Sequence, residues 1–121
     1  MREVKSTINY RGTDYSIVFN LNVMEAIQGE YGTVAAWGEK TDGKAGEVDV
    51  KALIFGLTEM FNEGIEIEND ERGTNIPLLS HKKVARMLSE IGIENATAKL
   101  NGVVIESVES DESDESDEKN V

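Results

Sequence analysis

The stretch that decides the fold is Asp49-Val50-Lys51-Ala52-Leu53-Ile54-Phe55-Gly56-Leu57-Thr58-Glu59-Met60-Phe61, the most apolar helix that the sequence predicts. Its large apolar residues recur every three or four positions, which places them along one side of a helix. Asp49 can cap the start by accepting a hydrogen bond from an exposed backbone N–H, and Gly64 can end the helix in a left-handed conformation. We therefore expect a central helix that buries a broad apolar face.

Two short strands are expected ahead of this helix. Polar and apolar residues alternate from Val4 to Tyr10 and again from Tyr15 to Phe19, as in strands with one buried face. Between them, Arg11-Gly12-Thr13-Asp14 contains the Gly and Asp that favour a tight turn. The strands should pair as a hairpin, and because a lone hairpin is marginal in water it should pack on helices.

The segment between the hairpin and the central helix is expected to hold one short helix and a loop. Asn22 can cap this helix and Gly32 can end it. The glycine-rich loop from Thr33 to Gly46 can carry a turn of helix around residues 34–37. A single Trp in such a loop, here Trp37, is either a plug over the core or a partner-binding anchor. We keep Trp37 as a possible partner-binding residue.

Beyond the central helix, Ile65-Glu66-Ile67-Glu68 alternates briefly and gives way to a polar excursion over residues 69–75. The acids there lack the spacing and closing Glu of an EF-hand loop. With one His and no Cys, zinc also lacks ligands. We expect no metal and no cofactor.

Ser80 should begin a further helix that ends at Gly92. Residues 94–107 have two interpretations, because Asn101-Gly102 favours a hairpin while the apolar spacing is helical. We expect a helix there.

The negative net charge limits the classes of partner that the protein can bind. The 121-residue chain carries 24 acidic and 12 basic residues, a net charge of -12. From residue 106 onward, eight acids against one lysine give -7, which leaves -5 for the rest. Such a chain is repelled by phosphates and anionic lipid, so we expect neither nucleic-acid nor membrane binding. The Ser/Asp/Glu triplets near the end cannot bury enough apolar surface to order themselves.

No catalytic group stands out. Ser80 and His81 are adjacent, and neighbouring helix residues point in different directions, so a helix cap is the better interpretation than a nucleophile and base. Lys82, Lys83 and Arg86 form a basic face that a helix-turn-helix DNA reader could use, but the acidic total argues against it. We keep these three residues as possible partner-binding residues. We expect that the protein is not an enzyme.

The expected fold is α+β, with an N-terminal β-hairpin packed on a small bundle of about four helices. One globular domain should span residues 1–107, and residues 108–121 should form a disordered acidic tail. The N-terminus begins with alternation rather than an apolar run, and no segment is long enough to cross a bilayer. We therefore expect no signal peptide and a cytoplasmic protein.

The order of these features resembles a known family. A leading hairpin ends in Tyr15-Ser16-Ile17-Val18-Phe19-Asn20-Leu21, a helix Val23-Met24-Glu25-Ala26-Ile27-Gln28 closes on Glu30-Tyr31-Gly32, and the apolar central helix precedes Leu79-Ser80-His81-Lys82-Lys83-Val84-Ala85-Arg86-Met87-Leu88. With the acidic end, this resembles the tail assembly chaperones of long, non-contractile-tailed phages and prophages of Gram-positive bacteria. The likeness covers residues 4–108.

The resemblance implies a protein of the host cytoplasm, outside the mature virion, that coats the tape-measure protein during tail building. It also implies recruitment of tail-tube subunits, and self-association into a homo-oligomer. Family members often have a longer form made by ribosomal frameshifting, of which this chain would be the shorter product. The competing hypothesis is an acidic regulatory or inhibitor module whose tail imitates nucleic acid.

Overall fold

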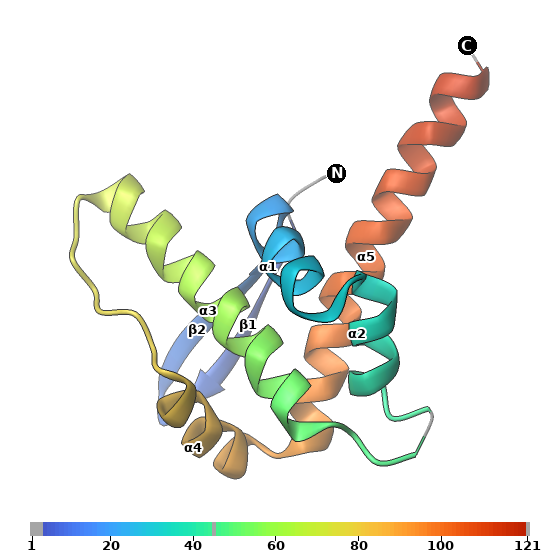
Figure 1. The fold of residues 1–121 in the computed structure, drawn as a ribbon. Coiled ribbons are helices and arrows are strands. Elements are labelled where there is room, and N and C mark those ends of the chain that lie inside the picture. The colour runs from blue at the N-terminus through green and yellow to red at the C-terminus, as the bar shows by residue number, and fades with distance from the viewer. Residues whose placement is uncertain (1–3, 45, 121) are drawn as a thin grey trace.

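The computed structural model describes residues 4–44 and 46–120, with side chains for residues 5–44 and 46–107. The elements in chain order are β1 (Val4–Tyr10), β2 (Thr13–Phe19), α1 (Leu21–Tyr31), α2 (Val34–Thr41), α3 (Val50–Arg72), α4 (His81–Ile91) and α5 (Ile93–Asn120). Figure 1 shows α3 crossing in front of the antiparallel hairpin, with α4 below it. The predicted α+β class, a hairpin packed on a small helical bundle, is confirmed. The described helices number five, because the predicted loop contains α2.

The hairpin turns within two residues. Tyr10 pairs with Thr13, so only Arg11 and Gly12 form the loop, and both have positive φ, 51° and 82°. Positive φ at both central residues is typical of a type I′ turn, whose twist matches that of the paired strands. Thr13 and Asp14, expected in the turn, therefore belong to β2.

The predicted end of the central helix was wrong. Helix α3 continues through Gly64 to Arg72 and ends at Gly73, which has φ 66°. Gly64 serves a different purpose, since a Cβ there would lie 3.0 Å from the carbonyl oxygen of Ser16. The missing side chain lets α3 approach β2 closely. The alternation of residues 65–68 is thus part of a helix, with Ile65 buried.

Side chains cap the other helices largely as predicted. Ser80 accepts from the backbone N–H of Lys83 at 3.1 Å and begins α4, which ends at Gly92. The start of α1 was predicted two residues late: Asn20 is its cap, accepting from Val23 N–H at 3.3 Å. Asn22 instead donates to the Glu63 carboxylate.

One apolar cluster contains residues from both strands and all five described helices. The helix predicted for residues 94–107 is confirmed, because α5 begins at Ile93 and buries Ala96, Leu100 and Val103. A disordered tail was expected over residues 108–121; the backbone of residues 108–120 is drawn as the continuation of α5, and the side chains of residues 108–121 lie outside the described part. Among the described residues, none of the helices has both the length and the apolar character to span a bilayer.

Candidate functional site

After α3 the chain turns at Gly73 and runs back along this helix as an extended stretch, residues 74–80, here called the return segment. Two asparagine side chains of α3 hold its backbone. The Asn69 amide donates to the carbonyl of Ile76 at 3.0 Å and accepts from its N–H at 2.9 Å. The Asn62 amide does the same with Leu79, at 3.0 and 2.8 Å. Each side chain thus satisfies both polar groups of one residue.

The spacing of these two asparagines fits an extended chain. Residues 62 and 69 are seven apart, about 10.5 Å along a helix, and residues 76 and 79 are three apart, about 10 Å along a strand. Pro77 lies between them, where neither asparagine needs an N–H, and it restricts Ile76 to an extended conformation. The return segment is therefore held mainly through its backbone; Leu79 packs against the core, while the side chains of Ile76 and Leu78 stay exposed.

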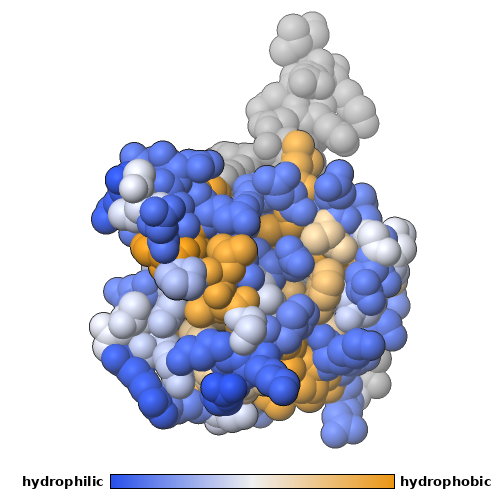
Figure 2. Space-filling view, turned by 60° about the vertical axis from the view of Figure 1, so that its left-hand side comes forward, coloured by the Kyte–Doolittle hydropathy of each residue, from blue (hydrophilic) through white to orange (hydrophobic). Residues whose placement is uncertain are grey.

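An apolar groove of about 490 Å³ lies between the return segment and β2. Its apolar lining comes from Tyr15, Phe61, Ile65, Ile76, Pro77, Leu78 and Leu79. Ile76 is 40% exposed and Leu78 50%. Figure 2 brings this side of the molecule forward and shows apolar surface between hydrophilic residues. The groove is a concave site of the size that takes up small ligands or a row of partner side chains.

The charges around the groove are acidic. Among the described residues that line it, Asp14 and Glu68 carry the carboxylates and none is a Lys or Arg. Asp14 accepts from the side-chain amide of Asn9 at 2.9 Å. Glu68 pairs with Arg72 at 3.5 Å on the exposed surface, and such a pair contributes little. Both carboxylates can therefore meet a cation brought by a partner.

Trp37, one of the predicted partner-binding residues, lies in the core. It is 0% exposed and its indole N–H donates to the carbonyl of Ala52 at 3.0 Å. The ring packs directly on Gly56: a Cβ added to this glycine would lie 2.3 Å from Cζ2 of Trp37. Trp37 thus fixes α2 against α3 and presents no surface to a partner. Of the two interpretations that the sequence allowed, the structure matches the plug over the core.

The three basic candidates lie on α4 and do not line the groove. Lys82 and Arg86 are exposed. Lys83 is half-buried, with its Nζ 5.4 Å from the centroid of the Tyr10 ring. Arg11 lies 5.3 Å from the same centroid and pairs with Glu90 at 3.1 Å. Lys83 and the Arg11–Glu90 pair thus join α4 to the hairpin tip, a contact that the sequence alone did not reveal, while Lys82 and Arg86 stay exposed.

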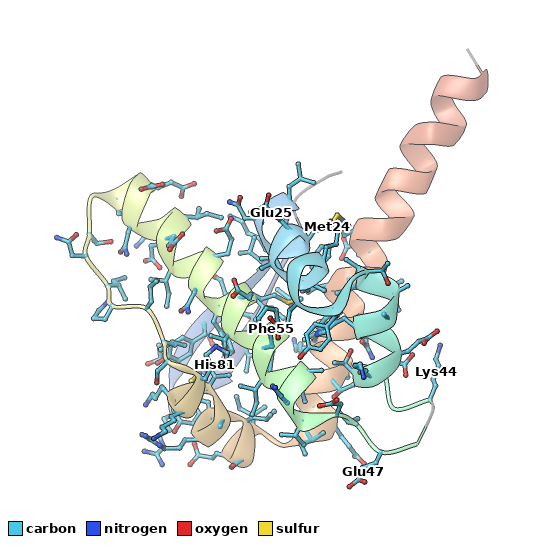
Figure 3. All side chains as sticks on the ribbon, in the orientation of Figure 1. Met24, Glu25, Lys44, Glu47, Phe55 and His81 are labelled. Carbon is cyan, nitrogen blue, oxygen red and sulfur yellow. The ribbon has the colours of Figure 1, made fainter. Side chains whose placement is uncertain are left out.

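The Ser80 oxygen accepts from the backbone N–H of Lys83, as a helix cap does. His81 instead lies near an aromatic row: its ring centroid is 6.4 Å from that of Phe55, which is 5.6 Å from Tyr31. Figure 3 shows Phe55 on α3 and His81 at the start of α4. Burial raises the pKa of Tyr31, and the Asp49 and Glu30 carboxylates raise it further.

Within the described residues, no three His, Cys, Asp or Glu side chains come together as metal ligands. Comparison of the chain with family models, with curated proteins and with solved structures gives no match. The sequence signals that could have revealed the groove are the two asparagines seven apart on α3 and the apolar residues after Gly73.

Proposed function

We propose that this protein is a tail assembly chaperone of a long, non-contractile-tailed phage or prophage of Gram-positive bacteria. In this role it binds the tape-measure protein, helps recruit tail-tube subunits and is displaced before the virion is complete. The proposal starts from the resemblance in the order of strands, helices and acidic end. It makes the protein a binding module of the host cytoplasm that acts without catalysis, cofactor or metal.

The observation that carries the proposal is the groove with its exposed Ile76 and Leu78. Apolar side chains that are held on a fixed backbone and left in contact with water favour association with another protein. Because the return segment is already ordered, binding costs little additional conformational entropy. A tape-measure protein, as a long helical chain with apolar faces, is a client that needs such cover during assembly.

The charge supports reversible binding. A net charge of -12 keeps chaperone molecules apart and disfavours precipitation of a loaded client. It also disfavours nucleic acid and anionic membranes as partners. A homo-oligomer, which the resemblance implies, has to form through a surface where the apolar gain exceeds this repulsion.

Co-expression with the tape-measure gene of the same genome tests the proposal. The tagged protein should co-purify with the tape-measure protein at low and at moderate salt. Absence of a complex under both conditions would contradict the chaperone function.

A variant with the acids of residues 109–118 changed to their amides separates this function from the competing one. A chaperone should still bind its client through the body, whereas an inhibitor that imitates nucleic acid should lose its target. Loss of binding to a nucleic-acid-binding protein that the unaltered chain binds would favour the inhibitor module, and unchanged binding of the tape-measure protein would favour the chaperone.

A further inference from the structure

We infer that the groove between β2 and the return segment binds a helical segment of the client that carries a row of large apolar side chains flanked by Lys or Arg. This inference rests on the proposed function and assigns the client surface to particular residues. The chemistry of the occupant follows from the apolar lining of the groove, from the backbone groups on the edge of β2 and from the carboxylates in the lining.

The apolar part of the occupant follows from the lining. The floor is made by Phe61 and Ile65 of α3, and one wall by Ile76 and Leu78 of the return segment. A cavity of about 490 Å³ accepts several large side chains but is too small for a folded domain. Side chains at helical spacing of three and four residues project in such a row from one face of an amphipathic helix.

A helix fits this site better than an added strand. In the hairpin, alternate residues of β2 point their backbone groups away from β1, and these are Asp14, Ser16 and Val18. At Ser16 that edge is already against α3, since a Cβ at position 64 would lie 3.0 Å from its carbonyl oxygen. Asp14 alone remains open toward the groove, and strand addition needs several consecutive pairs. The occupant therefore binds through side chains.

The flanking cations follow from Asp14 and Glu68, the two acids in a lining that contains no Lys or Arg; Glu68 also has an exposed, weak pair with Arg72 outside the lining. A Lys or Arg next to the apolar row meets one of these carboxylates, which adds specificity and a faster association at low salt. The same acids disfavour a second copy of this chain as occupant, because its charge is also strongly negative.

The test uses the full chain and a fluorescein-labelled amphipathic helical peptide of about 18 residues, five turns, with leucines on one face and flanking lysines. A matched peptide carries glutamates in place of the lysines. Fluorescence anisotropy should show binding of the lysine peptide that weakens as salt increases. Equal binding of the two peptides would overturn the charge part of the inference, and absence of binding would overturn all of it.

Two exposed apolar residues provide a matched pair of variants. Leu78 is 50% exposed in the groove wall, and Ile105 is 54% exposed on α5, away from the groove. Leu78→Asp should weaken binding of the lysine peptide by at least about tenfold, whereas Ile105→Asp should change it by less than about twofold. Equal effects of the two substitutions would contradict the assignment.

The carboxylates are tested by Asp14→Asn combined with Glu68→Gln. This variant should bind the lysine peptide roughly threefold to tenfold more weakly and with a flatter salt dependence. Amide NMR shifts of the unaltered protein provide a readout that needs no variant. They should change at Tyr15, Ile76 and Leu78 on addition of the lysine peptide, and changes confined to other helices would contradict the groove.

The outcomes separate this inference from the proposed function. If the tape-measure protein co-purifies but Leu78→Asp binds the peptide normally, the chaperone function stands and the groove assignment fails. If the peptide binds in the groove but the tape-measure protein does not co-purify, the groove stands and the phage function fails. If Leu78→Asp converts a dimer to a monomer and no peptide binds, a second copy occupies the groove and the inference is wrong.

Discussion

Gly56→Ala should destabilise this protein although alanine is the better helix former. Gly56 lies in the buried part of α3, against the Trp37 ring of α2. A Cβ at this position would be 2.3 Å from Cζ2 and 2.9 Å from Cε2 of Trp37. Since Trp37 is 0% exposed, its ring cannot yield without displacing other core side chains.

The magnitude follows from three contributions. Overpacking of a filled core costs about 3 kcal/mol at the upper end of the usual range. Movement of the ring also breaks the hydrogen bond from the indole N–H to the Ala52 carbonyl, which costs about 1 kcal/mol. The helix propensity of alanine returns about 1 kcal/mol. The free energy of unfolding should therefore fall by about 3 kcal/mol, a decrease in Tm of roughly 12 °C for a domain of this size.

Gly29→Ala is the matched control. Gly29 lies within α1, and a Cβ there has no neighbouring atom within 4 Å. The same substitution should therefore raise the free energy of unfolding by about 0.5–1 kcal/mol. Urea unfolding followed by circular dichroism measures both variants. A Gly56→Ala protein as stable as the unaltered one would refute the argument that Trp37 is locked in place.

Three further outcomes are expected. Gly64→Ala should lower the free energy of unfolding by about 1 kcal/mol, less than Gly56→Ala, because its Cβ would lie 3.0 Å from a β2 carbonyl; urea unfolding measures this, and a stabilised variant would contradict it. Asn62→Ala with Asn69→Ala should accelerate hydrogen exchange of the Ile76 and Leu79 amides at least about tenfold while most core amides stay protected; unchanged exchange would show that the asparagines do not hold the segment. Since burial raises the pKa of Tyr31 above 10.0, the unfolded chain loses this proton first, so stability is fully present below pH 10 and falls as the pH rises through the folded pKa. Titration of phenolate absorbance, with Tyr31→Phe as control, should show the raised midpoint, and a midpoint at or below 10.0 would be the contrary result.

Local sequence signals predicted most of the elements. The alternation of the two strands, the Asp49 and Ser80 caps and the Gly32 and Gly92 stops all act through neighbouring residues, and these were predicted correctly. The error at Gly64 has a tertiary cause. Glycine there permits a close approach to β2, and this requirement cannot be distinguished from a helix stop without knowing what lies opposite.

The candidate groove was not predicted, for a related reason. Asn62 and Asn69 were ordinary polar residues in the sequence, and their role depends on the return segment folding back beside α3. Trp37 and the basic residues of α4 attracted attention by residue type. The structure places Trp37 in the core and Lys83 against Tyr10, whereas Lys82 and Arg86 are exposed and stay predicted partner-binding residues.

The two α3 amides grip only main-chain atoms at positions 76 and 79. Proline is barred from those two positions because it has no N–H, and the hydrogen bonds that hold the chain there involve none of its side chains. The side chains at positions 76 and 78 can therefore be changed without removing the hydrogen bonds that hold the backbone of the segment. Substitutions in the return segment could therefore change which protein is bound while the rest of the fold stays the same.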